Sequence, residues 1–181
     1  WFNGTSEDFS RFVGPRGLVD DRKYFVIVMD ALGNGNSTSP SNSVLRGSKF
    51  PGIRIADMVE SQWRLVKELR IERVHAMLGV SMGGMQVFHW MVAHPEFLKK
   101  AVLIVSTPKM TEKDVQLWSK AVPLGRPAPE AKEKPKGFSL DKVSGVVSAG
   151  LSQYRKYEQP FNPLRQFEAM VAHEIFKPAG G

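Results

Sequence analysis

One serine stands in a sequence context suited to nucleophilic chemistry. Residues 79–83 read G-V-S-M-G, the pattern of a nucleophile elbow, in which a strand turns sharply into a helix and exposes the serine hydroxyl. We predict that Ser81 is a nucleophile. We also predict that the backbone N–H of Met82, at the helix start, stabilises an oxyanion. Gly79 and Gly83 are expected to let the strand and the helix approach closely.

The residues on either side predict the strand and the helix that such a turn needs. Residues 74–80 form an apolar stretch, and residues 82–94 read as a helix that Pro95 stops. An alternative interpretation is a tight strand–helix turn in which Ser81 only caps the helix. The long loop at 30–43 lacks the third glycine of a dinucleotide fingerprint, so we predict no cofactor there; the loop is expected to line the pocket entrance.

Composition limits the classes of protein that remain. The chain has 181 residues, of which 42% are hydrophobic and 24% charged, as in a globular domain. It has no cysteine, which excludes disulfides, thiolate catalysis and cysteine-bound metal. The net charge of +7 is read as a solvated face, so we predict neither a nucleic-acid partner nor a membrane partner. Because the chain begins with Trp1, we expect a piece of a longer protein.

Strand and helix signals alternate through the first 110 residues, which predicts an α/β class with a parallel sheet and flanking helices. The predicted strands are 24–29, 74–80 and 101–105, and the helices between them are 54–70 and 82–94. On the first of these helices, one face carries the apolar residues Ile55, Val59, Val66 and Leu69.

Strand signals are missing from the remaining residues, 111–181, which we predict to form a helical cap or lid over a core at 1–110. The expected helices are 111–122, 139–154 and a last one that begins at Asn162-Pro163 and runs to His173, with a proline-rich connection at 123–137.

A serine nucleophile needs a general base, because a free hydroxyl is a poor nucleophile near neutral pH. The chain has four histidines, His75, His89, His94 and His173. None follows a later strand, where the base of a nucleophile-elbow enzyme belongs. We therefore assign none of them as catalytic and expect the triad Asp and His outside this chain. The second oxyanion donor is expected before Trp1, so residues 1–181 alone should be inactive.

Several runs of residues resemble one known family. They are Y-F-V-I at 24–27, L-G-N-G-N-S-T-S-P at 32–40, I-A-D-M-V-E-S-Q at 55–62, L-G-V-S-M-G-G-M-Q at 78–86 and Q-F-E-A-M at 166–170. Together they resemble the homoserine O-acetyltransferase family of α/β-hydrolase proteins and its hydrolase-like relatives. The resemblance implies a partial α/β-hydrolase fold with a cap.

By this resemblance, Ser81 is acylated by a small-molecule donor such as acetyl-CoA, and a small-molecule acceptor or water then takes the acyl group. The resemblance also implies a triad Asp and His beyond Gly181. Separately, we expect a homodimer in the full-length form and a cytoplasmic location. An asparagine and an arginine of the acetyltransferases align with Trp118 and Val122. The arginine would bind the substrate carboxylate through two hydrogen bonds, and nearby Lys120 offers charge but no planar guanidinium to do so. These departures favour a relative that hydrolyses esters or acylates another acceptor. The alternative is a non-catalytic relative that acts as a binding module.

Overall fold

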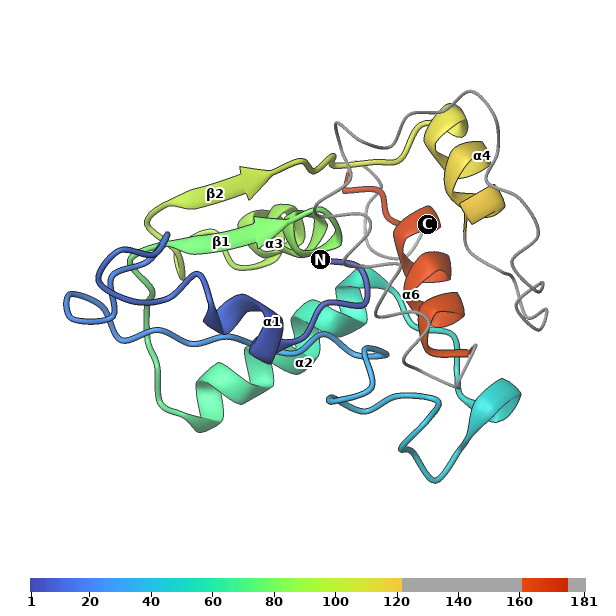
Figure 1. Cartoon of the computed structure of the whole chain (residues 1–181), viewed down its shortest axis with the longest axis horizontal. Helices are drawn as coiled ribbons and strands as arrows, with labels where there is room; N and C mark the ends of the chain where they lie inside the picture. Colours follow the sequence, from blue (N-terminus) through green and yellow to red (C-terminus); the bar gives the residue numbers. More distant parts are fainter. Residues whose placement is uncertain (122–160, 176–181) are drawn as a thin grey trace.

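The computed structural model describes residues 1–121 and 161–175 and arranges helices around a short parallel sheet (Figure 1). The elements are α1 (Ser6–Ser10), the 3-10 helix η1 (Gly47–Lys49), α2 (Ile55–Glu68), β1 (Met77–Val80), α3 (Met82–Ala93), β2 (Ala101–Ile104), α4 (Glu112–Ala121) and α6 (Phe161–Val171). Helices α4 and α6 lie beyond the ends of the strands, at the right of Figure 1. Two expected segments, the helix 139–154 and the connection 123–137, lie outside the described residues.

β1 and β2 are parallel neighbours joined by α3, so the predicted strand–helix–strand unit is confirmed. Their register places Met77 opposite Ala101 and Val80 opposite Ile104. An isolated bridge between Val74 and Leu98 precedes the ladder, so the strand is shorter than the predicted 74–80. Because parallel strands end at the same edge of a sheet, the residues after β1 and β2 lie side by side.

The prediction of a buried strand at 24–29 is wrong for the described part of the chain. No backbone hydrogen bond joins these residues to β1 or β2, and the Phe25 side chain is 90% exposed. Apolar, β-branched residues favour strands because they pack well on a pleated surface, but a strand also needs a hydrogen-bonded neighbour. Residues 26–29 are half-buried without one.

Helix α2 confirms the predicted amphipathic face, with one correction. Ile55, Val59 and Val66 are buried, whereas Leu69 is 52% exposed. Leu69 is the C-cap residue, so it lies outside the last helical turn. The 3.6-residue period that places a side chain on the buried face no longer applies there.

Helix α6 packs onto the core through its apolar face. Phe167 and Met170 belong to one buried cluster with Met58 of α2 and with the first turns of α3. The described part of the helix begins at Phe161, and the Asn162 side chain, predicted to cap it, bonds Ser41 in a distant loop. The division at residue 110 between core and cap stays a prediction.

A buried chain of amides fixes α3 against α2. The indole N–H of Trp90 donates to Gln62 Oε1 at 2.8 Å, and Gln62 Nε2 donates to Gln86 Oε1 at 2.6 Å. Gln86 Nε2 then reaches the Met82 carbonyl at 3.4 Å. All three polar side chains are buried, so each needs a partner. This chain ends at the first residue of α3, next to Ser81.

Replacing Gln62 by Leu should destabilise the complete protein by about 2–6 kcal/mol. The change leaves the Trp90 N–H and the Gln86 carbonyl unpaired in the core, and each unpaired buried group costs about 1–3 kcal/mol. Urea denaturation measures the loss. Gln116→Leu, at an exposed site of α4, is the matched control and should change stability by less than about 0.5 kcal/mol. Equal stability of the two variants would contradict the prediction.

Candidate active site

The backbone turns from strand to helix at a single residue, Ser81. Its φ of 53° and ψ of −120° are rare for a residue with a side chain. Four hydrogen bonds hold its peptide groups. Its N–H donates to the Ile104 carbonyl at 2.9 Å, and its carbonyl accepts from the N–H groups of Gly84 and Met85 at 2.9 and 3.2 Å and from Ser106 Oγ at 2.8 Å.

Glycines make room for this turn at two positions. A Cβ on Gly79 would collide with the Gly83 carbonyl, and a Cβ on Gly84 would collide with the Ser106 side chain. Among the described residues, a Cβ added at Gly83 would meet the Trp1 nitrogen at 3.7 Å, which is an ordinary contact. We had expected Gly83 to lack a side chain so that the strand and the helix could approach closely. The structure gives that role to Gly84, whereas Gly83 places its backbone carbonyl against Gly79.

The start of α3 presents unpaired donors beside the serine hydroxyl. No side chain caps the helix, and within the described residues the N–H groups of Met82 and Gly83 have no acceptor. Ser81 is half-buried, and its Oγ bonds to no described residue. A free hydroxyl therefore lies next to a helix N-terminus, whose N–H groups and dipole favour negative charge.

The first residues of the chain lie against this helix start. The Trp1 nitrogen is next to Gly83, and the buried Phe2 side chain shares a cluster with Met82. The Asn3 N–H is taken by Gln166 Oε1 at 2.8 Å. The Phe2 N–H has no acceptor among the described residues. This makes Phe2 a candidate for the second oxyanion donor, which we had expected before Trp1.

Comparison with known proteins decides the family. A family described as the alpha/beta hydrolase fold matches residues 2–139. The chain belongs to the α/β-hydrolase fold family. Within that family it is similar both to esterases and to homoserine acyltransferases, so the resemblance read from the serine motif is confirmed at this level.

Two curated relatives and one solved structure illustrate the kinds of protein to which this chain is similar. The ethyl acetate hydrolase of Pseudomonas veronii is 34% identical over 163 residues, which cover 86% of this chain and 44% of that protein. A homoserine O-acetyltransferase of Methanohalophilus mahii is 41% identical over 101 residues, 52% of this chain and 21% of that protein. The acetyl esterase MekB superposes with a TM-score of 0.77 at 26% identity, over 96% of this chain and 61% of that one. The chain thus spans less than half the length of both curated relatives.

No histidine of this α/β-hydrolase chain bonds to Ser81. His75 is exposed and lies against Tyr24, with ring centroids 5.4 Å apart. His94 is the C-cap residue of α3, where its backbone N–H donates to the Trp90 carbonyl at 2.8 Å, and its ring stacks on Trp63 with centroids 4.0 Å apart. Among the described residues no cluster of His, Asp and Glu could hold a metal ion.

The remaining two histidines meet where α6 packs on α3. The rings of His89 and His173 lie 6.4 Å apart. Burial lowers the pKa of His173 to about 4, and the nearby His89 adds to the effect. Burial also lowers the pKa of His89. His173 is 6% exposed and its Nε2 is buried without a partner, so both rings are neutral at pH 7 and serve packing.

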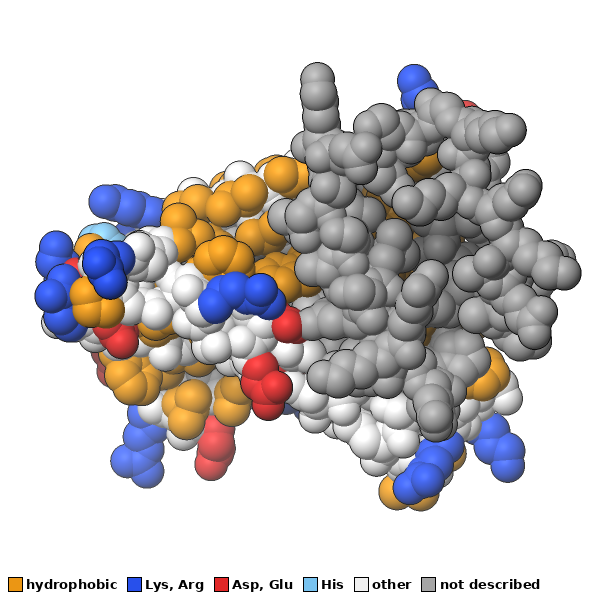
Figure 2. All heavy atoms as spheres, viewed as in Figure 1, with side chains coloured by type: hydrophobic (Ala, Val, Ile, Leu, Met, Phe, Trp, Pro, Cys, Tyr) orange, Lys and Arg blue, Asp and Glu red, His pale blue; other side chains and the backbone are white. Residues whose placement is uncertain are grey.

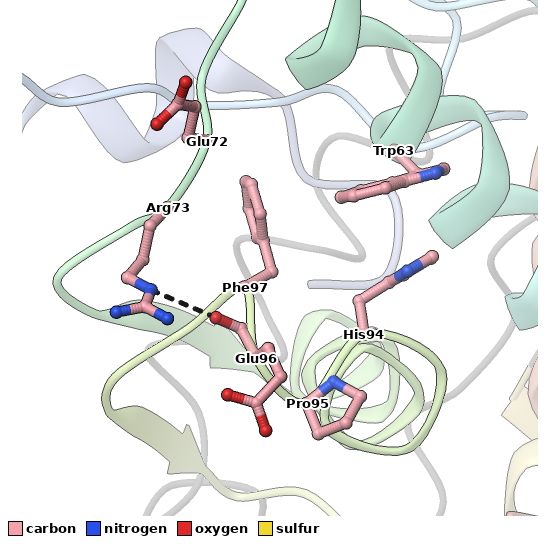
Figure 3. Close-up of a pocket in the computed structure, with 7 residues that line it drawn as sticks. All are labelled: Trp63, Glu72, Arg73, His94, Pro95, Glu96 and Phe97. Atoms are coloured by element: carbon pink, nitrogen blue, oxygen red, sulfur yellow. Dashed lines mark hydrogen bonds between the residues drawn. The ribbon is translucent and has the colours of Figure 1, made fainter.

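The pocket drawn in Figure 3 is separate from the elbow. It surrounds the loop that follows α3, with Trp63 stacked over His94, Phe97 at its centre and the Arg73 Nε bonded to the Glu96 carbonyl at 3.2 Å. The 12 residues of α3 separate this loop from Ser81 by about 18 Å. This pocket is therefore no part of the candidate active site.

Lysine and arginine side chains gather at the end of the molecule where β1 and β2 begin, at the left of Figure 2. Lys99 and Lys100, both exposed, directly precede β2. Ser81 follows the other end of the neighbouring strand. This basic cluster is thus remote from the serine, in keeping with a solvated face.

Helix α4 brings an aromatic ring to the chain start. Trp118 packs edge-on against Phe2, with centroids 5.6 Å apart, at the position where the acetyltransferase resemblance expects an asparagine. Val122, aligned with the arginine, lies outside the described residues, and nothing is described of the Lys120 side chain. The contact between Trp118 and Phe2 is therefore apolar.

Sequence reasoning missed three residues that the structure brings to the elbow. The sequence held a signal for Gly84, because a second glycine directly after Gly83 indicates another position where a side chain does not fit. Ser106 follows β2 as Ser81 follows β1, and the ends of adjacent parallel strands meet. Gln166 had no local signal, because its partner Asn3 lies 163 positions away.

Gly84→Ala should destabilise the complete protein by about 1–3 kcal/mol, the usual effect of overpacking. The added methyl displaces Ser106 and breaks its bond to the Ser81 carbonyl. Ser106→Gly removes the obstructing atoms, so the double variant should be more stable than the sum of the two single effects predicts. Urea denaturation of all four proteins measures the coupling, and strictly additive effects would contradict the contact.

Acidification should weaken the fold through His173. An unfolded histidine has a pKa near 6.5, so between pH 6.5 and 4 the unfolded chain binds more protons than the native one. Stability therefore falls as the pH falls, by about 2 kcal/mol at most from pH 7.5 to pH 5. The urea midpoint of the complete protein should drop over this range, and His173→Gln should reduce the drop. His75→Gln, at an exposed site, is the control; an unchanged drop in His173→Gln would refute the assignment.

Proposed function

We propose that this α/β-hydrolase is an acyl-transfer enzyme in which Ser81 forms an acyl-enzyme. One observation carries the proposal: Ser81 has a strained backbone conformation, and its hydroxyl, which bonds to no described residue, lies beside a helix start that it does not cap. Strain of this kind persists only where surrounding contacts over-determine it, and it gathers at functional sites. A helix-capping serine would instead bond the N–H groups of the first turn, and this one does not.

The reaction begins when Ser81 Oγ attacks the carbonyl carbon of an acyl donor. A C–O bond forms, the hydroxyl proton passes to the general base, and the carbonyl oxygen becomes an oxyanion. The N–H groups of Met82 and Phe2 are the proposed donors to that oxyanion. Collapse of the intermediate expels the alcohol or thiol with its proton and leaves the acyl group on Ser81. Water or a small-molecule hydroxyl then attacks the acyl carbon, the bond to Ser81 Oγ breaks, and the acyl group leaves as a carboxylic acid or a new ester while Oγ regains its proton from the base.

Hydrolysis of small, uncharged esters is the better-supported outcome. The apolar contact between Trp118 and Phe2 offers no charged group to an amino-acid carboxylate. The ethyl acetate hydrolase relative also matches 86% of the chain. Acyl transfer to homoserine is the second candidate, supported by the 41% identity to a homoserine O-acetyltransferase over 101 residues.

Other parts of the reaction scheme stay predictions. The mechanism needs no cofactor, and acetyl-CoA would enter as a substrate. The Asp and His of a triad are expected outside residues 1–181. No helix in the described ranges is long and apolar enough to cross a membrane. Homodimerisation, a cytoplasmic location and the inactivity of residues 1–181 alone remain expectations from the sequence.

Ser81→Ala should abolish esterase activity of the complete protein and its covalent labelling by a fluorophosphonate, because both need the Oγ. Mass spectrometry of the labelled peptide identifies the modified residue. Ser61→Ala is the matched control: Ser61 lies on α2 and its hydroxyl donates to the Met58 carbonyl of the same helix, so activity and labelling should persist. Labelling that survives Ser81→Ala would overturn the proposal.

The acceptor is tested with the same protein. Steady release of acetate from p-nitrophenyl acetate or ethyl acetate, unaffected by homoserine, supports hydrolysis. Release of free CoA from acetyl-CoA only when homoserine is present supports transfer. A protein that binds esters without turnover, and is not labelled at Ser81, would indicate the non-catalytic binding module.

A further inference from the structure

One buried amide on α6 connects the cap region to the start of the chain. Gln166 is fully buried. Its Oε1 accepts the Asn3 N–H at 2.8 Å, and its Nε2 donates to the Leu32 carbonyl at 3.2 Å. A glutamine matches this pair of partners because its amide carries both an acceptor and donors. Three segments far apart in sequence are thus joined at one side chain.

The segment that Gln166 holds is itself under strain. Asn3 has a φ of 55° and is buried. The turn around it is closed by the Gly4 N–H, which donates to the Trp1 carbonyl at 2.9 Å. Asn34 Nδ2 holds the other side, at the Gly4 carbonyl, at 3.1 Å. Such a backbone conformation is kept only by surrounding contacts, and Gln166 supplies the one made to the Asn3 N–H.

The held segment includes the candidate donor at Phe2. The Asn3 N–H that donates to Gln166 belongs to the peptide group between Phe2 and Asn3. This peptide group follows the one that carries the Phe2 N–H. Displacement of that peptide rotates the Phe2 backbone and moves its N–H relative to Met82. Oxyanion stabilisation depends on donors fixed at hydrogen-bond distance from the developing charge, so small shifts reduce the rate.

We propose that Gln166 is a positioning residue for acyl transfer, which sets the Phe2 N–H in its donor position when α6 docks on the core. This inference rests on the proposed function, and it assigns to the cap helix a part in transition-state stabilisation beyond covering the serine. Gln166 contacts no reacting atom in this scheme; it acts through Asn3.

The same helix offers a matched control. Asn162, one turn earlier, is also buried and also makes two bonds to a distant loop: its Oδ1 accepts the Ser41 N–H at 3.0 Å and its Nδ2 donates to Ser41 Oγ at 2.8 Å. It has no bond to residues 1–4. Loss of Asn162 therefore weakens the docking of α6 without releasing the Asn3 peptide.

The experiment compares Gln166→Met and Asn162→Leu in the complete protein, each a near-isosteric loss of two hydrogen bonds. With p-nitrophenyl acetate, Gln166→Met should lower kcat by about 10–100-fold, somewhat less than the 10²–10³-fold loss of a whole oxyanion donor, with KM within about threefold. Affinity for a trifluoromethyl ketone, which forms an oxyanion on the enzyme, should fall in parallel. Asn162→Leu should change kcat by less than about threefold at a comparable loss of Tm.

A third variant tests rescue. Gln166→Glu keeps an acceptor for the Asn3 N–H and loses the donor to Leu32, so its kcat should lie closer to wild type than that of Gln166→Met. The inference is overturned if Gln166→Met loses no more kcat than Asn162→Leu, or if only its KM changes. That result, with Ser81→Ala still inactive, would leave the proposed function intact, whereas an active Ser81→Ala would remove both.

Discussion

The strand-to-helix reversal at Ser81 is the constraint on which the surrounding structure depends. A non-glycine residue with φ of 53° and ψ of −120° costs about 1–3 kcal/mol. The Ile104 carbonyl and the Ser106 hydroxyl offset this cost by bonding the Ser81 peptide groups. Both partners come from the end of β2, so the turn is stable only where the two strands are paired.

The parallel register explains why the second strand matters to the first. Val80 lies opposite Ile104, so the residues that leave the two strands emerge at the same edge of the sheet. Val105 also has a positive φ, of 49°, and this turn directs Ser106 toward the Ser81 carbonyl. Gly84 has no side chain at that contact, and any Cβ there would displace Ser106. The elbow is therefore a property of the paired strands and α3 together.

Local patterns predicted much of this unit because its determinants are local. The G-x-S-x-G run, the apolar residues before it and the helical residues after it lie within about 20 positions, and period and turn chemistry act over that range. The prediction of a strand at 24–29 was wrong for a physical reason. Its composition reports a preference for burial, whereas a strand requires a partner, which composition cannot report. The prediction that Leu69 is buried was wrong because the 3.6-residue period of apolar residues does not show where a helix ends.

Long-range polar contacts were beyond sequence reasoning for a different reason. Gln62, Gln86 and Gln166 are uncharged polar residues on helices, and such residues usually face water. Here each is buried because a specific acceptor or donor meets it: the Trp90 indole reaches Gln62, and the Asn3 N–H reaches Gln166. No periodicity encodes these pairings, since they exist only after the helices have packed.

Because the two strands are parallel, the exposed lysines before β2 and the serine after β1 lie at opposite ends of the sheet. The exposed Lys99 and Lys100 precede β2, whereas Ser81 and the unpaired N–H groups of α3 follow β1. The partial positive charge beside Ser81 that we propose for an oxyanion would come from oriented peptide groups, which do not titrate. Mobile surface cations at the other end, about one helix length away, are screened by water and salt over that distance.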